Sequence, residues 1–133
     1  MRSLGLDIGD KRIGVALSDP QGILASPFTI INRKDETVDI EAIISIISQH
    51  QVERVIVGLP RSMDGSVGKQ AEKAKVFVQD LGRQTKIPIE FRDERLSTVS
   101  ARRLMRDAKN KKVRHDDVIA AAIILQGYLD ERY

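Results

Sequence analysis

The chain has 133 residues, of which 41% are apolar and 31% are charged, with a formal net charge of +3. This length fits one domain with a continuous core, and the composition is that of a soluble globular protein rather than a disordered one. The absence of cysteine excludes disulfides, thiolate zinc sites and cysteine nucleophiles, so any metal must have oxygen or histidine ligands. We therefore expect a single domain over residues 1–133.

Two further properties concern location and partners. The N-terminal MRSLGLDIG leads directly into a patterned strand without a signal-peptide core, and no apolar run approaches the roughly 18 residues of a membrane span. We expect a cytoplasmic protein that does not associate with a membrane. Residues 95–114 hold eight Lys or Arg and one acid, Asp107, which suits a polyanionic partner and equally suits a solvated helix face followed by a basic loop.

Hydrophobic periodicity predicts strands first and helices later. Alternating or continuous apolar runs with turn residues between them indicate strands, and apolar residues at spacings of three and four indicate helices. The predicted strands are Ser3–Gly9, Arg12–Ser18, Ile23–Ile31, Arg54–Pro60 and Ile87–Glu94, and the predicted helices are Glu36–His50, Val67–Gln84, one from Ser97 or Ser100 to Ala108, and one over residues 116–130. The polar segment KNKKVRH before the last helix is expected to be a mobile loop.

This order of elements predicts an α/β fold. Three antiparallel strands, followed by alternating helices and strands, form a mixed five-stranded sheet with helices on both faces. Right-handed crossovers place the fourth and fifth strands beyond the first, which gives the strand order 3-2-1-4-5.

Three acids stand where an apolar pattern disfavours them: Asp7 in the first strand, Glu94 at the end of the fifth, and Asp117 at the start of the last helix. A buried carboxylate without a partner is costly, so each should be paired or bound to a cation. In the predicted topology all three can converge at the carboxyl edge of the sheet. Three acids without a histidine pair favour Mg²⁺ or Mn²⁺, and two such ions would activate water for phosphodiester hydrolysis.

Structural roles for these acids remain open from the residues alone. The alternatives are ion pairs of Asp7 with Lys11 or Arg12, ion pairs of Glu94 with Arg92 or Arg95, and a helix cap at Asp117. Asp93 is also a rival to Glu94, and Asp116 is a rival to Asp117. Alternation along the fifth strand puts Asp93 on the face of its apolar residues and Glu94 on the other face, which does not choose between them.

Four motifs follow one another from residue 4 to about residue 130: LGLDIGDKRIGVALSD, VIVGLPRSMDGSVGKQAEKAKVF, RDERLSTVSARRL and DDVIAAAIILQGYLD. Together they resemble the YqgF family, described as Holliday-junction-resolvase-like proteins and proposed pre-16S rRNA nucleases. The resemblance implies a ribonuclease H-like fold. It also implies catalytic, metal-binding roles for Asp7, for Glu94 of the DER motif and for Asp117, which precedes the paired alanines of the last helix.

Basic residues near these motifs are the candidate nucleic-acid contacts. Their positions at turns, at helix starts and along one helix face suit phosphate binding, with ordinary surface charge as the alternative. They are Lys11, Arg12, Arg61, Lys69, Arg95, Arg102, Arg103 and Arg106. With two Tyr, three Phe and no Trp, recognition of shape and phosphate fits better than base stacking. The glycines around Asp7 (Gly5, Gly9 and Gly14) would let backbone or nucleic acid approach, or Gly9 would serve the turn.

The function expected is metal-dependent phosphodiester hydrolysis. The resemblance implies structured RNA, namely the 5′ end of precursor 16S rRNA, with branched DNA as the alternative substrate and a monomer or weak homodimer as the assembly. An actin-like or sugar-kinase-like phosphotransferase also opens with a DIG hairpin, but it needs two lobes and 133 residues supply one. A non-catalytic nucleic-acid-binding assembly factor is the other rival.

Overall fold

A computed structural model of the protein describes residues 1–59, 68–93 and 116–132. The helix expected from Ser97 or Ser100 to Ala108 and the loop expected after it lie outside these ranges. So does most of the loop that follows the fourth strand.

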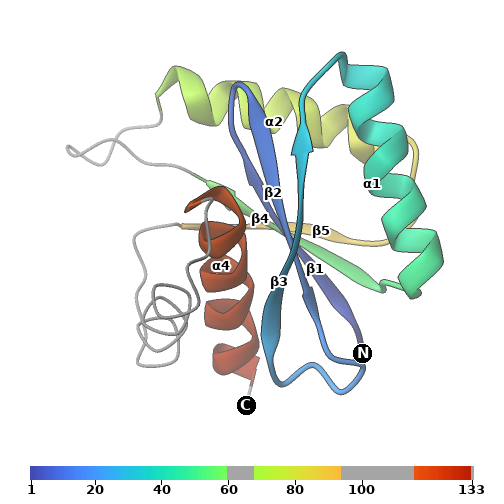
Figure 1. The fold of residues 1–133 in the computed structure, drawn as a ribbon, viewed down its shortest axis with the longest axis vertical. Coiled ribbons are helices and arrows are strands. Elements are labelled where there is room, and N and C mark those ends of the chain that lie inside the picture. Colours follow the sequence, from blue (N-terminus) through green and yellow to red (C-terminus); the bar gives the residue numbers. More distant parts are fainter. Residues whose placement is uncertain (60–67, 94–115, 133) are drawn as a thin grey trace.

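The sheet has five strands: β1 (Ser3–Ile8), β2 (Arg12–Ser18), β3 (Ala25–Asn32), β4 (Arg54–Leu59) and β5 (Ile89–Asp93). Their order is β3-β2-β1-β4-β5, as predicted from the sequence (Figure 1). β1 is antiparallel to β2 and parallel to β4, and β5 is parallel to β4. The central strand is therefore β1, and the carboxyl ends of β1, β4 and β5 lie at one edge of the sheet.

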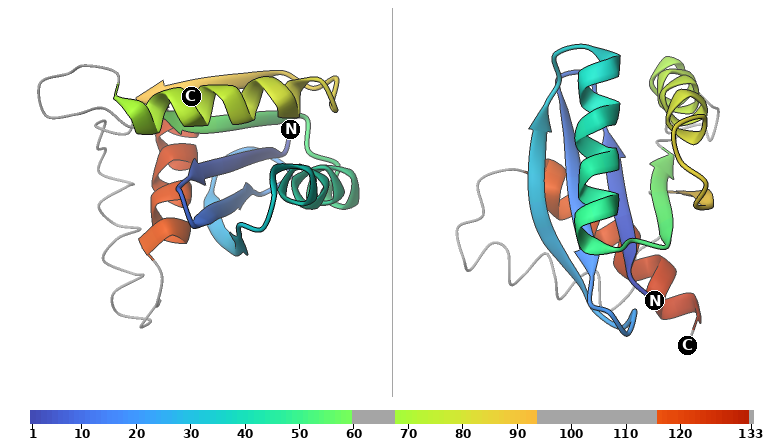
Figure 2. Two further views of the ribbon diagram at one scale, coloured as in Figure 1. Left: turned by 90° about the horizontal axis from the view of Figure 1, so that it is seen from above. Right: turned by 90° about the vertical axis from the view of Figure 1, so that its right-hand side faces the viewer.

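Helices cover both faces of this sheet (Figure 2). The two helices α1 (Glu36–His50) and α2 (Lys69–Gly82) pack on one face, and α4 (Asp116–Arg132) packs on the other. Alternation along the strands separates two cores: Leu4 and Leu6 lie under α1 and α2, whereas Ala16 and Ile56 lie under α4. Within the described ranges, none of the helices combines the length and apolar character needed to cross a membrane.

The first helix begins and ends at the predicted residues because both ends are capped. The side chain of Asp35 accepts the N–H of Val38 at 2.9 Å, which satisfies one of the free donors of the first turn. At the other end Gln51 adopts a left-handed conformation with φ of 54°, and its N–H returns to the last turn.

The third strand begins two residues later than predicted. The side-chain oxygen Oδ1 of Asp19 accepts the N–H groups of Ile23 and Leu24 at 2.7 and 3.0 Å. These two residues therefore belong to a turn, completed by Gly22 with φ of 74°, and pairing with β2 starts at Ala25. The hydrogen bond from the N–H of Leu24 is the main reason why the pKa of Asp19 lies below its ordinary value.

The other differences at element ends also have local causes. β1 stops at Ile8 because the N–H of Gly9 donates to the carbonyl oxygen of Arg12 at 2.9 Å and closes the turn into β2. The second helix stops at Gly82 because the N–H of Arg83 donates to the carbonyl oxygen of Asp80, three residues back, in a tightened last turn. β5 starts at Ile89 rather than Ile87, and the last helix extends to residue 132.

Candidate functional site

Asp7 lies near the carboxyl end of the central strand β1. It is half-buried and stands opposite Gly14 of β2. Its neighbours Leu6 and Ile8 belong to the core under α1 and α2. Because side chains alternate along a strand, Asp7 faces the other side of the sheet, the side covered by α4, together with Gly5.

Gly5 is the point of closest approach between β1 and α4. A Cβ atom on Gly5 would lie 2.8 Å from the carbonyl oxygen of Ala121 and 2.8 Å from Cβ of Leu125. No side chain fits at such distances, so the strand must have glycine here for the helix to pack. Of the two roles considered for the glycines near Asp7, the approach of backbone therefore applies to Gly5.

The direction of α4 follows from a contact of Gln126. Its side-chain oxygen accepts the N–H of Ala25 at 2.8 Å. Ala25 is paired with Ser18, whose hydroxyl oxygen accepts the N–H of Ser3 at 2.8 Å. Ser3 is the first residue of β1, so Gln126 lies level with the start of that strand.

α4 therefore runs antiparallel to β1. Ala121 lies level with Gly5, and the residues after it lie toward the start of β1. Asp117 stands one helical turn before Ala121, which places its backbone on the side of Asp7. The structure thus brings the backbones of these two predicted site residues to the same end of the contact between β1 and α4, and Asp116 is beside them as the first residue of the helix.

The third predicted acid, Glu94, lies outside the described residues, directly after the end of β5. Within β5, the side chain of Arg92 is directed toward α4. It binds Glu131 of that helix through two hydrogen bonds of 2.6 and 2.8 Å. Both terminal nitrogens of Arg92 take part in this contact. The hydrogen bond from Arg92 is the main cause that holds the pKa of Glu131 below its ordinary value.

The part of the chain that the structure describes contains no group of three His, Asp or Glu side chains placed to hold a metal ion. Among the three predicted ligands, Asp7 alone has a described side chain. Asp7 nevertheless suits a hard cation, because it is a carboxylate on a rigid central strand at the carboxyl edge of the sheet.

Three of the predicted phosphate contacts lie within the described residues. Lys11 and Arg12 are exposed at the turn between β1 and β2, close in sequence to Asp7, and Lys69 is exposed at the start of α2. The remaining five lie outside the described residues: Arg61, Arg95, Arg102, Arg103 and Arg106.

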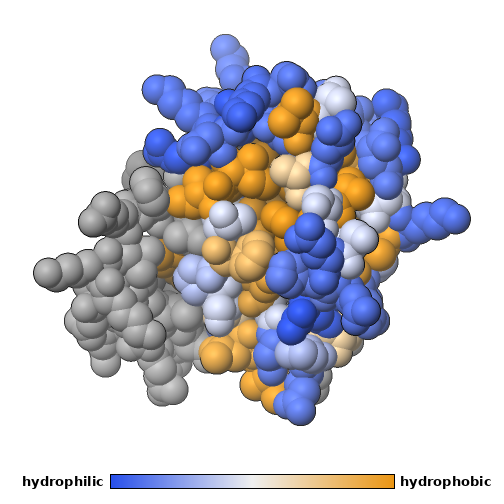
Figure 3. All heavy atoms as spheres, turned by 45° about the vertical axis from the view of Figure 1, so that its right-hand side comes forward, coloured by the Kyte–Doolittle hydropathy of each residue, from blue (hydrophilic) through white to orange (hydrophobic). Residues whose placement is uncertain are grey.

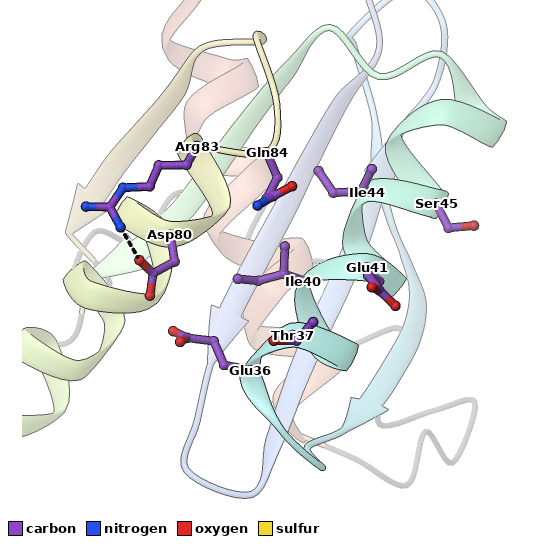
Figure 4. A pocket seen from close by; sticks show the side chains of 9 residues that line it. All are labelled: Glu36, Thr37, Ile40, Glu41, Ile44, Ser45, Asp80, Arg83 and Gln84. Atoms are coloured by element: carbon purple, nitrogen blue, oxygen red, sulfur yellow. Dashed lines mark hydrogen bonds and ion pairs between the residues drawn. The ribbon is translucent and has the colours of Figure 1, made fainter.

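A groove of about 540 Å³ lies between α1 and α2, on the face of the sheet opposite α4. Its floor includes Ile40 and Ile44, and polar side chains form its rims (Figure 4). The side of the molecule drawn in Figure 3 shows apolar residues in the middle, bordered by hydrophilic ones. This groove was not predicted from the sequence, and it lies on the other side of the sheet from the face of Asp7.

At one end of the groove the carboxyl groups of Glu36 and Asp80 point toward one another (Figure 4). Partial desolvation, a hydrogen bond with Asp80 and the charge of Asp80 together raise the pKa of Glu36. Asp80 also accepts a hydrogen bond of 3.2 Å from Arg83. The pair links the start of α1 to the end of α2.

Sequence reasoning missed two buried polar residues that join elements of the fold. Asp39, on the inward side of α1, binds Arg33, and Gln126, on the inward side of α4, binds the start of β3. A sequence signal was present for both, because each is a polar residue among the apolar residues of a helix. Such a residue is buried only with hydrogen-bond partners.

The comparisons with known proteins agree with this geometry. The family model described as RuvX, Holliday junction resolvase, matches residues 1–131. A curated protein of Dehalococcoides mccartyi named "Putative pre-16S rRNA nuclease" is 51% identical over 125 residues, which cover 93% of this chain and 94% of that protein. A protein of the same name from Desulforamulus reducens is 46% identical over 133 residues and covers 98% of this chain and 97% of its own.

Solved structures with the same fold include two resolvases. RuvC of T. thermophilus, in complex with a Holliday junction substrate, has a TM-score of 0.72 at 12% identity and covers 99% of this chain and 95% of its own. The fowlpox virus resolvase, in complex with Holliday junction DNA, has a TM-score of 0.60 at 15% identity, with 99% of each chain covered. At these identities the likeness establishes the fold, and it confirms the predicted ribonuclease H-like class.

Proposed function

The chain belongs to the RuvX family, and on this basis we propose that it is a nuclease that uses divalent metal ions to process the 5′ end of precursor 16S rRNA. RuvX and YqgF are two names of one family, so this membership confirms the family predicted from the four sequence motifs. It also confirms the nuclease class expected from that family. It also excludes the kinase-like alternative. The substrate, the metal and the roles of individual residues are the parts proposed here.

The observation that carries the proposal is the placement of Asp7 relative to α4. Asp7 is a half-buried carboxylate near the carboxyl end of the central strand, a setting that suits a bound cation. Here it faces the helix that carries Asp117, at the same end of the contact between strand and helix. In the sequence, Glu94 comes two residues after Arg92, which contacts α4 through Glu131.

The donor set suits Mg²⁺ or Mn²⁺. Asp7, Glu94 and Asp117 offer carboxylate oxygens, which hard divalent ions prefer. Two bound ions would supply an activated water and stabilise the leaving oxygen in phosphodiester hydrolysis. In this proposal Asp7 would hold the ions from the central strand, and Glu94 and Asp117 would complete the set of ligands.

The chain's own cations would orient the nucleic acid. Lys11 and Arg12 are exposed on the turn that follows Asp7, so they can contact the phosphates next to the cleaved one. Lys69 is exposed where α2 starts. Arg61, Arg95 and the arginines of residues 102–106 extend this basic surface in the proposal. Contacts of this kind recognise the backbone and the shape of structured RNA rather than its sequence.

Branched DNA is the second candidate substrate. Two observations favour it: the family model is described as a Holliday junction resolvase, and the two resolvase structures with the same fold hold junction DNA. The names of the full-length relatives, at 46% and 51% identity, favour RNA and carry more weight because the identity is much higher.

The test is a cleavage assay with two substrates in parallel. A pre-16S rRNA fragment and a four-way DNA junction are incubated with Mg²⁺, Mn²⁺ or a chelator. Wild type should cleave the RNA at its 5′ end only with metal, and Asp7→Asn should lose at least about 100-fold in rate, since it removes the central ligand. Asp10→Asn is the matched control. Asp10 is an exposed acid on the turn that follows Asp7, and the cleavage rate of this variant should stay near that of wild type.

Each contrary result has a definite meaning. Cleavage in the presence of chelator, or full activity of Asp7→Asn, would overturn the metal mechanism. Preferred cleavage of the junction would make branched DNA the substrate. Tight binding of the RNA with no cleavage of either substrate would establish the non-catalytic assembly factor.

A further inference from the structure

Arg33 directly follows β3 and joins three separate parts of the fold. Its Nη1 donates to the carbonyl oxygen of Gly9 at 2.9 Å, and its Nε donates to Oδ2 of Asp39 at 3.4 Å. Its guanidinium carbon lies 5.1 Å from the centre of the Phe77 ring. One side chain therefore contacts the turn between β1 and β2, the helix α1 and the helix α2.

The backbone of Arg33 also binds the turn between β1 and β2. Its N–H donates to the carbonyl oxygen of Lys11 at 2.9 Å, while the N–H of Gly9 donates to the carbonyl oxygen of Arg12. Gly9 comes two residues after Asp7. Any displacement of the Gly9 carbonyl therefore acts on the end of the strand that carries Asp7.

The ion pair behind this contact is well shielded. The side chain of Asp39 is 2% exposed and that of Arg33 is 23% exposed. The second carboxylate oxygen of Asp39 accepts the N–H of Lys34 at 3.2 Å, so the carboxylate is fixed before it binds the guanidinium. A pair with so little access to water is screened less by solvent and salt than one on the surface.

A second ionic contact of the turn, between Asp10 and Lys73, is much weaker. Asp10 and Lys73 of α2 are 3.5 Å apart, and their side chains are 60% and 65% exposed. Pairs with this exposure contribute little to stability. Arg33 is thus a stronger link between this turn and the helices α1 and α2 than Lys73 is.

We propose that Arg33 is a positioning residue for the Asp7 site: it ties the turn after Asp7 to α1 and α2, so that the Asp7 carboxylate is presented in one fixed place. The proposal rests on the proposed function, in which Asp7 would be a metal ligand. A rigid support matters because a misplacement of about 1 Å in a catalytic group can lower the rate by about 100-fold. Arg33 itself touches neither metal nor substrate in this proposal.

The test compares Arg33→Met with Arg33→Lys and with Arg54→Met. Methionine keeps an apolar stem over Phe77 and loses every donor, whereas lysine keeps the charge and a donor. Arg54 is the matched control: it is 26% exposed, binds Glu90 at 2.8 Å and lies 6.0 Å from the Tyr128 ring, but it pairs with the start of β1. Arg33→Met should lose more thermal stability than Arg54→Met, because it leaves the buried carboxylate of Asp39 without its cation whereas Glu90 is exposed, so all variants are assayed well below their melting temperatures.

Two readouts separate positioning from general destabilisation. Amide hydrogen exchange of Gly9 should be about tenfold faster in Arg33→Met and unchanged in Arg54→Met. In the cleavage assay, kcat of Arg33→Met should fall about 10- to 100-fold with KM within about twofold of wild type, since substrate binding is not altered. Arg33→Lys should recover part of both losses.

The outcomes distinguish this inference from the proposed function. Unchanged exchange at Gly9 in Arg33→Met, or a fall in kcat no larger than in Arg54→Met, would overturn the role of Arg33. If wild type cleaves neither substrate, the proposed function fails, and with it the role of Arg33 in catalysis; the exchange of Gly9 then shows whether Arg33 holds the turn at all.

Discussion

Gly5 of β1 and Ala121 of α4 approach so closely that a Cβ atom on Gly5 would lie 2.8 Å from the Ala121 carbonyl oxygen. This contact sets the height of α4 over the sheet. Because Asp7 is two residues beyond Gly5 and Asp117 is one turn before Ala121, it also influences the spacing between the backbones of these two residues. A small residue that looks like a packing detail therefore controls the geometry of the proposed site.

Gly5→Ala should lower both stability and cleavage. The added methyl group meets backbone on one side and Leu125 on the other, so α4 must shift, and overpacking of this kind costs about 1–3 kcal/mol. Gly82→Ala is the control, because a Cβ there would lie 3.9 Å from the nearest heavy atom, a methyl carbon of Ile89. Denaturant unfolding and the cleavage rate are the measurements. Equal stability of the two variants would show that α4 adjusts freely at Gly5.

The sheet was predicted correctly because the signals for each strand are local in the sequence. Each strand is an apolar run with turn residues at its ends, and handedness then leaves one placement for β4 and β5. The start of β3 was missed because it depends on a side chain that binds the backbone. Asp19 binds the N–H groups of Ile23 and Leu24 and so delays β3, and apolar periodicity carries no trace of such a bond.

The candidate site was predicted in part for the same reason. Asp7 is conspicuous as a charge within an apolar strand, and the structure puts it on the face of α4. Arg33 was not conspicuous, because an arginine after a strand looks like surface charge until its contacts with Gly9 and Asp39 are known. Residues that act through long-range contacts leave little pattern in the sequence.

Gln126→Leu should destabilise the protein by about 1–3 kcal/mol, because it leaves buried polar groups without partners. In the wild type the side-chain oxygen of Gln126 accepts the N–H of Ala25 at 2.8 Å, and its nitrogen donates to the carbonyl oxygen of Ile23 at 3.0 Å. Gln84→Leu, at an exposed position, should change stability by no more than about 0.5 kcal/mol. Similar chemical denaturation midpoints for the two variants would argue against this role of Gln126.

Glu131→Gln should lower stability at neutral pH but not in acid. The hydrogen bond from Arg92 lowers the pKa of Glu131 below its ordinary value of 4.5, so the folded state favours the charged form. The stabilisation is present above the unfolded pKa and is lost as the pH falls through the folded pKa. Since Glu131 is 59% exposed, the loss at pH 7 should be no more than about 1 kcal/mol. Unfolding curves at pH 7 and about pH 3 measure this loss of stability. Glu53→Gln, at an exposed position, is the control.

Glu36→Gln should have the opposite effect and raise stability at neutral pH. Desolvation and the neighbouring Asp80 raise the pKa of Glu36, so the folded state favours its protonated form. Folding therefore takes up protons near this pKa, and the stability of the wild type falls as the pH rises through the unfolded value and then the folded one. Above that range both carboxylates are charged and repel each other.

A glutamine at position 36 removes this repulsion and can still donate a hydrogen bond to Asp80. Solvent screens the pair, so the expected gain is small, a rise in Tm of about 1–2 °C at pH 7 that disappears as the pH is lowered below 4.5. Glu41→Gln is the control, because Glu41 is an exposed acid on the same helix and lines the same groove. Thermal unfolding of both variants across this pH range gives the answer: an equal gain from Glu41→Gln would assign the effect to net charge, whereas a gain confined to Glu36→Gln assigns it to the contact with Asp80.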